Sequence, residues 1–217
     1  MLDEIVLSKA LNEIGYRRVG QDVYRADWST EVEHLIFVHV YEIFLAAHFG
    51  MREKEAHAFA VKSIERYGGY LYQLGPRDDP FFCPMRFSIG GLASWGIRQS
   101  LTIPSMPASA LADRIRRDIE TKLFPFIRHV MRSDQLLQLL LSDEEPYPWS
   151  RCNGAIRAAI IVNLAQRMGV PAEEVLAWLE PYFKQIAPHL FRAPDPRPDA
   201  YVRRIIEDGF SNSALAQ

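Results

Sequence analysis

Apolar residues near the start of the chain are spaced for a short helix followed by a β-hairpin. One helical face is formed by Leu2, Ile5, Val6, Ala10, Leu11 and Ile14. Gly15 then suits the left-handed position just beyond a helix end. Residues 16–19 and 23–28 have the pattern of two strands, and the three residues between them, 20–22, are a connection typical of hairpins.

A longer alternating stretch over residues 32–41 predicts a central strand, because both of its faces are largely apolar. Residues 43–49 have the pattern of its neighbour, closed by Gly50. One long bent strand is the alternative, since no turn dipeptide separates Val40 from Ile43. The period then returns to that of a helix over residues 52–67.

The middle of the chain is irregular, and the remainder is helical. A strand is predicted over residues 85–89, ended by Gly90 and Gly91, and a weaker strand over residues 95–103. After Pro107 the apolar period predicts a long helix kinked near Pro125 and then further helices. These further helices are expected over residues 136–141, 154–168, the stretch after Gly169-Val170-Pro171, and 200–208.

The order of these elements predicts an α+β fold. We expect a small, mainly antiparallel sheet with flanking helices, followed by a C-terminal helical subdomain. The sheet half covers residues 1–104, and a helical half over residues 105–210 packs on it, with a single compact domain as the alternative. Residues 211–217 are expected to form a flexible tail.

Composition narrows the class of protein. The chain has 217 residues, a net charge of -2 and a pI near 6.3, which disfavours a protein built to grip nucleic acid. Cys83 and Cys152 have neither zinc-site nor disulfide-framework spacing, so no metal or other cofactor is expected. The acidic N-terminus lacks the pattern of a signal peptide, and no apolar run is long enough for a membrane helix. These features favour a cytoplasmic protein.

Several apolar and turn segments resemble a bacterial family catalogued as domain of unknown function 4304. The segments that carry the resemblance are Leu11 with Ile14-Gly15-Tyr16-Arg17-Arg18, Val23-Tyr24-Arg25, Phe44–Gly50, and Cys83–Gly90 with Trp95. Together they span roughly residues 1–140. Ser88 departs from the pattern where a second arginine is expected, and the helical tail beyond Trp149 is longer. The resemblance implies a compact α+β fold in bacteria, similar to the immunity partners of bacterial toxins.

Histidines and one cysteine are the candidates for catalytic chemistry. Two or three of His34, His39, His48 and His57 would need to converge with Glu33 or Glu53 to hold a metal. The strand pattern opposes this convergence, because it places His34 and His39 on opposite faces. Cys83 would serve as a nucleophile with His48 or His57 as its base, although a cysteine between Phe82 and Pro84 is more typical of a buried residue.

Charged segments suggest how the protein would bind a partner. Arg114, Arg116 and Arg117 are diluted by neighbouring acids, which favours a solvated, salt-bridged helix face. An acidic loop with aromatic residues suits docking onto a basic protein, and its candidate partner-binding residues are Asp143, Glu144, Glu145, Tyr147 and Trp149. A solvated loop in which Trp149 folds back as an anchor is the simpler interpretation.

The sequence therefore predicts a non-enzymatic protein-binding module, immunity- or antitoxin-like, whose partner is a toxin-like protein or a second copy of the chain. A small hydrolase or transferase with a site near the sheet histidines is one alternative. A homo-oligomeric structural protein is the other.

Overall fold

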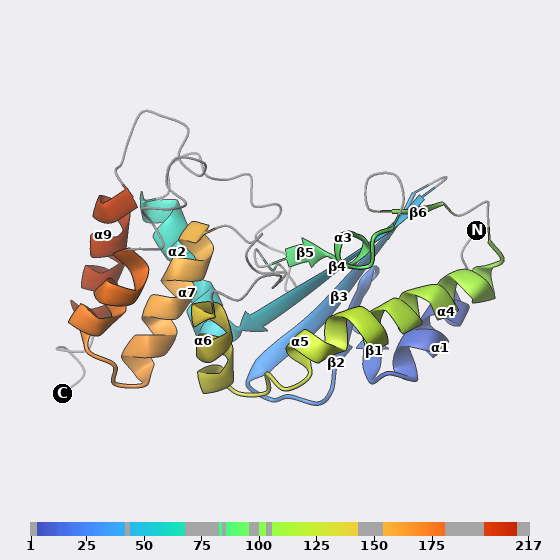
Figure 1. Ribbon diagram of the computed structural model, residues 1–217, viewed down its shortest axis with the longest axis horizontal. Coiled ribbons are helices and arrows are strands. Elements are labelled where there is room, and N and C mark those ends of the chain that lie inside the picture. Colours follow the sequence, from blue (N-terminus) through green and yellow to red (C-terminus); the bar gives the residue numbers. More distant parts are fainter. Residues whose placement is uncertain are drawn as a thin grey trace.

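Six antiparallel strands form one sheet, in the order β1-β2-β3-β4-β5, with β6 pairing with the first residues of β4 (Figure 1). The computed structural model describes residues 4–41, 44–67, 83, 86–95, 100–102, 106–142, 154–180 and 198–211. The strands are β1 (Tyr16–Arg18), β2 (Val23–Ala26), β3 (Val32–Val40), β4 (Phe44–Glu53), β5 (Arg86–Ser88) and β6 (Leu101–Thr102).

Helices lie along the sheet and beyond one of its ends (Figure 1). They are α1 (Glu4–Asn12), α2 (Lys54–Tyr67), α3 (Ile89–Leu92), α4 (Ala108–Asp118), the π-helix η3 (Ile119–Leu123), α5 (Phe124–Ile127), α6 (Ser133–Leu141), α7 (Gly154–Arg167) and α9 (Pro198–Ser211), with a further helix over residues 172–180. Helices α1 and α4 pack together beside the sheet, whereas α7 packs against α2, α6 and α9. The predicted α+β class, with an antiparallel sheet and flanking helices, is confirmed. Among the described residues, no helix has both the length and the apolar character needed to cross a membrane.

Two glycines end helices as predicted. Gly15 follows α1 with a φ of 86°, and Gly169 follows α7 with a φ of 74°. At the second site the Gly169 N–H donates to the Gln166 carbonyl, and the Val170 N–H donates to the Ala165 carbonyl at 3.0 Å. This pair of bonds is a Schellman motif, and the next helix begins three residues later.

The central strand β3 is buried from His34 to Val38, which confirms that both faces of its middle are covered. It joins β4 as a hairpin, so the alternative of one long bent strand was wrong: the Tyr41 N–H donates to the Phe44 carbonyl at 2.8 Å. Gly50 does not close β4. It pairs with Leu35 on one side and Arg86 on the other, and this two-sided pairing carries the strand on to Glu53.

The region after β5 also differs from the prediction. Gly90 and Gly91 were expected to stop a strand, but they lie inside the short helix α3. The Ser88 side chain caps this helix by accepting from the Gly91 N–H at 3.0 Å, an interaction that favours a helix start over a turn. The indole of Trp95 donates to Asp118 at 2.6 Å, which ties the chain to α4. Of the strand predicted over residues 95–103, the described part shows only β6.

The predicted irregularity near Pro125 takes the form of a π-helix. Pro125 has no N–H to donate within the helix, and η3 ends two residues before it. This wider turn keeps Ile119, Leu123 and Ile127 buried on one side. The chain therefore passes the proline without leaving the core.

One hydrophobic cluster runs through the described residues from Leu7 to Ile206. Packing crosses the predicted boundary at residues 104 and 105 in both directions, because α4 lies against α1 and α7 lies against α2. Three polar contacts add to this packing near the turn before β3. Ser29 donates to the Met131 carbonyl at 2.6 Å, His34 contacts the Val130 carbonyl at 2.7 Å, and Glu31 accepts from the Ser133 N–H at 2.9 Å.

Candidate functional site

The acidic loop that the sequence nominated for partner binding lies outside the described residues. This applies to all five of its candidates: Asp143, Glu144, Glu145, Tyr147 and Trp149. Their role stays a prediction.

His34 lies in the core. It is fully buried, its Nε2 lies 2.7 Å from the Val130 carbonyl, and its ring packs near those of Trp28 and Phe49. Because a carbonyl only accepts, Nε2 carries a proton. Burial lowers the pKa of His34 to about 4. This histidine is a structural element of the aromatic core.

The other chemical candidates are divided between different surroundings. His39 and His48 form a ring pair with centroids 5.7 Å apart, on the face of the sheet opposite His34. Cys83 is fully buried, and its Sγ donates to the Met51 carbonyl at 3.3 Å. Within the described part of the chain, no group of three or more His, Cys, Asp or Glu side chains is placed to hold a metal ion.

A groove of about 650 Å³ runs between strands β2 and β3 and the first turns of α2 and α6. Nine of the thirteen described residues that line it are charged, and we call it the charged groove. Its carboxylates are Asp27, Glu31, Glu33, Glu53 and Glu55. Its cations are Arg17, Arg25, Lys54 and Arg167. These residues come from four strands, two helices and the turn between β2 and β3, so only the folded chain gathers them.

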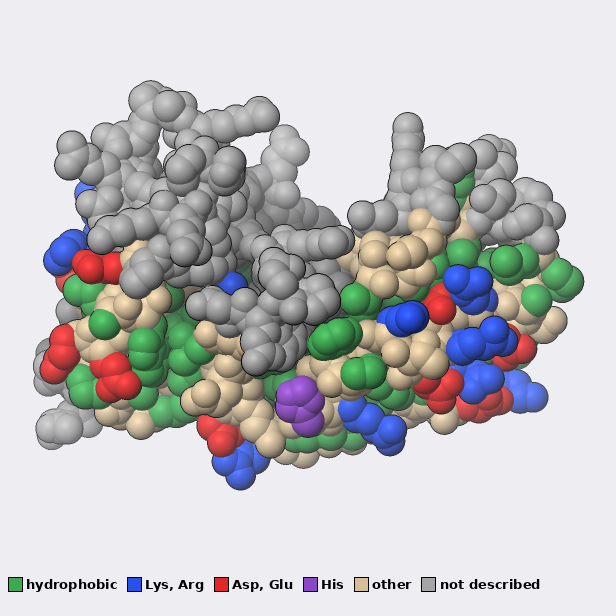
Figure 2. Space-filling view, in the orientation of Figure 1, with side chains coloured by type: hydrophobic (Ala, Val, Ile, Leu, Met, Phe, Trp, Pro, Cys, Tyr) green, Lys and Arg blue, Asp and Glu red, His purple; other side chains and the backbone are tan. Residues whose placement is uncertain are grey.

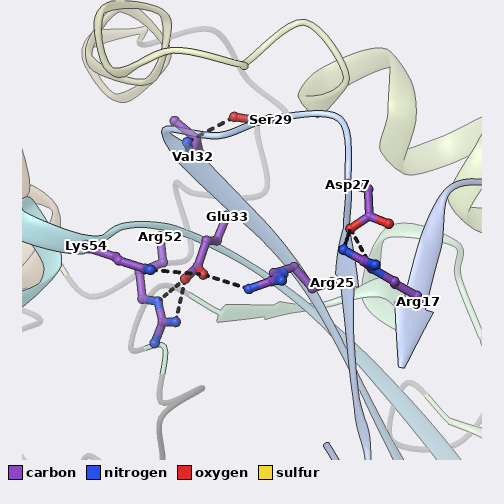
Figure 3. Close-up of polar contacts among 8 residues, drawn as sticks. All are labelled: Arg17, Arg25, Asp27, Ser29, Val32, Glu33, Arg52 and Lys54. Atoms are coloured by element: carbon purple, nitrogen blue, oxygen red, sulfur yellow. Dashed lines mark hydrogen bonds and ion pairs between the residues drawn. The ribbon is translucent and has the colours of Figure 1, made fainter. Parts of the chain in front are cut away.

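Glu33 is the carboxylate of this groove with three ion-pair partners (Figure 3). Arg52, the cross-strand partner of Glu33 on β4, donates to its Oε2 through Nε at 2.7 Å and also through its terminal nitrogen. Both side chains are only 11% exposed. Arg25 from β2 and Lys54 from α2 approach the other oxygen, at 3.5 Å and 4.0 Å. Three cations therefore surround one carboxylate.

The remaining carboxylates of the groove have structural roles. Arg17 holds Asp27 at 2.7 Å. Glu53 accepts from the Ala56 N–H at 2.8 Å, which caps the start of α2, and it shares Arg167 with Glu55. Nearby, a hydrogen bond from Arg132 lowers the pKa of Asp134 at the start of α6. The groove walls are thus fixed by ion pairs that also anchor helix ends.

Comparison of the chain with family models, curated proteins and solved structures found no match. The resemblance to the domain of unknown function 4304 family therefore stays a prediction.

A second charged surface is neutralised by its own pairs. Figure 2 shows Lys and Arg side chains interleaved with Asp and Glu over the part of the surface that α4 and α1 form. Arg116 alone lies within 4.0 Å of Glu13, Asp113 and Glu120. The helix face was predicted to be salt-bridged, and the structure confirms it.

The charged groove was not predicted from the sequence. Glu33 and Glu53 were expected only as possible metal ligands, and Arg17 and Arg25 only carried the family resemblance. The signal that would have found the groove is the strand register, because Arg25 and Arg52 lie on the same face as Glu33 from the two flanking strands. Sequence alternation gives the face of each residue but not which residues lie opposite one another.

Proposed function

We propose that this chain is a protein-binding module whose partner docks on the charged groove. The observation that carries the proposal is the open groove itself, in which charged side chains of both signs are held in place by elements distant in sequence. Complementary charge on a second protein would fix the orientation of that protein and speed its association.

The character of the lining supports a protein partner over a small molecule. Small-molecule pockets are mostly apolar with a few convergent polar groups. Here nine of thirteen described lining residues are charged, and Arg17, Lys54 and Glu55 expose most of their side chains. Such a lining resembles the polar rim of a protein interface.

The rigidity of the groove also favours binding. Glu33 and Arg52 hold each other while nearly buried, and Glu53 is 10% exposed. Side chains that are already ordered lose less conformational entropy when a partner arrives. The concrete form of the proposal is an immunity- or antitoxin-like protein, which the family resemblance supports.

Affinity capture from the native host tests this proposal. The tagged chain is compared with the Arg25→Glu, Lys54→Glu double variant, and bound proteins are identified by mass spectrometry. Lys62→Glu is the matched control, because Lys62 is exposed on the same helix as Lys54 but away from the groove. We expect a stoichiometric partner with the wild type and the control, and its loss with the double variant.

A further arm separates the groove from the acidic loop. The variant Asp143→Asn, Glu144→Gln, Glu145→Gln removes the charge of the loop. If this variant loses the partner while the groove variant keeps it, the loop is the docking surface and the groove assignment is wrong. A preparation without any stoichiometric partner would contradict the binding function itself.

A further inference from the structure

We infer that the charged groove recognises an acidic segment of its partner, with Arg25 and Lys54 as the residues that bind its carboxylates. This inference rests on the proposed binding function and adds the chemistry of the partner to it. It follows from which charges in the groove have close partners and which have only long contacts.

Every carboxylate of the groove has a donor within 3.1 Å. Glu31 accepts from both the N–H and the hydroxyl of Ser133, at 2.9 Å and 3.1 Å. Asp27 forms an ion pair with Arg17, and Glu33 accepts a hydrogen bond from Arg52, both at 2.7 Å. Glu53 and Glu55 share the guanidinium of Arg167, which lies 3.0 Å from the first and 2.9 Å from the second. Each carboxylate of the groove thus already has a close donor within the chain itself.

Two cations of the groove are not engaged in this way. In the described part of the chain, the carboxylate oxygen nearest to Arg25 is Glu33 Oε1 at 3.5 Å, and the same atom is nearest to Lys54 at 4.0 Å. Charge-assisted hydrogen bonds have lengths of about 2.7–2.9 Å, so both contacts are long. Glu33 is meanwhile neutralised by Arg52 at 2.7 Å. Immediately around Glu33, three cations therefore face one carboxylate, within a lining that has four cations and five carboxylates in total.

Both cations are accessible from the groove. The side chain of Lys54 is 75% exposed and that of Arg25 is 35% exposed. Because both approach the same Glu33 oxygen, a carboxylate that enters beside Glu33 reaches both donors (Figure 3). Glutamate or aspartate side chains on a polypeptide supply this group, and a run of them matches the open shape of the groove.

Fluorescence anisotropy with a labelled hexaglutamate peptide tests the inference on the full chain. Hexaglutamine and hexalysine peptides are the neutral and basic comparisons, at about 0.05 M and about 0.3 M salt. We expect hexaglutamate to bind most tightly and to weaken at the higher salt concentration. Arg25→Gln and Lys54→Gln should each weaken it about two- to fivefold, the loss of one exposed ion pair. Lys62→Gln should leave the affinity unchanged.

Glu33→Gln gives a result of the opposite sign. It removes the negative charge beside the incoming carboxylate, so hexaglutamate should bind about two- to fivefold more tightly if the variant remains folded by circular dichroism. If Glu33→Gln does not fold, Lys54→Gln still tests the inference, because Lys54 is 75% exposed and its replacement leaves the core intact.

The outcomes separate this inference from the proposed function. Equal affinity of the wild type and both cation variants for hexaglutamate would overturn the inference, as would tighter binding of hexalysine. If capture from the host still depends on the groove, the binding function stands and only the acidic partner is refuted. If capture does not depend on the groove, the docking site proposed for that function falls, whatever the peptides show.

Discussion

His34 is the residue whose burial has the clearest consequence for stability. Its pKa is about 4 in the folded chain and about 6.5 in an unfolded one. Between about pH 6.5 and pH 4, His34 is therefore protonated in the unfolded state but not in the native state, so the free energy of unfolding falls as the pH drops toward 4. The shift corresponds to about 3 kcal/mol in total, which is fully lost only below about pH 4.

The variant His34→Gln isolates this effect. A glutamine amide can donate to the Val130 carbonyl as His34 Nε2 does, but it does not titrate. Urea unfolding at pH 7.0, 5.5 and 4.5 should show a wild-type stability that falls more steeply than that of the variant. Parallel pH profiles of the two proteins would contradict the assignment of His34.

Tyr16 offers a second test at the same scale. Its hydroxyl is buried, burial raises its pKa, and it has no hydrogen-bond partner in the described part of the structure. Tyr16→Phe removes a polar group that loses its hydration on folding, so we expect no loss of stability and a gain of up to about 1 kcal/mol. Tyr24→Phe is the control, because the Tyr24 hydroxyl lies 3.2 Å from Ser8 Oγ and its removal should cost about 0.5–1 kcal/mol. Thermal unfolding measures the stability of both variants. A larger loss of stability in Tyr16→Phe than in Tyr24→Phe would be inconsistent with an unpaired Tyr16 hydroxyl.

Among elements, the contact between α7 and α9 depends on the absence of a side chain at Gly209. A Cβ built there would lie 2.7 Å from Val162 Cγ1 on α7. Gly209→Ala should therefore destabilise the fold by about 1–2 kcal/mol, although alanine is the better helix former. In a Val162→Ala background the same change should become neutral or stabilising by up to about 1 kcal/mol, because only the helix propensity remains. Chemical denaturation of the wild type, the two single variants and the double variant measures the free energy of unfolding of each. An equal destabilisation by Gly209→Ala in both backgrounds would contradict a clash with Val162.

The elements predicted well from the sequence are those set by local signals. Gly169 and the proline after it mark a helix end that depends on a few neighbouring residues, and the structure has that end. Gly50 and Gly90 were misjudged because distant or capping partners decide their state: β3 and β5 flank the first, and Ser88 caps the helix that contains the second. The charged groove was missed for the same reason, since Glu33 meets Arg25 and Arg52 only through strand register.

At the scale of the whole molecule, the sheet and the C-terminal helices share one apolar cluster among the described residues. The polar contacts of Ser29, Glu31 and His34 with residues 130–133 add to that connection. We therefore expect the two predicted halves to unfold in one transition. Tryptophan fluorescence reports on Trp28 and Trp95 in the predicted sheet half and on Trp149 and Trp178 in the predicted helical half, whereas far-ultraviolet circular dichroism reports mostly on the helices. Coincident curves are the expected result, and two separated transitions would establish independent domains.

Hydrogen exchange of the chain with and without its captured partner tests the central claim most directly. If the partner docks on the charged groove, the amides of residues 23–33 and 52–57 should exchange more slowly in the complex, while those of α4 should be unchanged. Protection confined to residues 143–149, or to α1 and α4, would contradict the account and move the docking surface elsewhere.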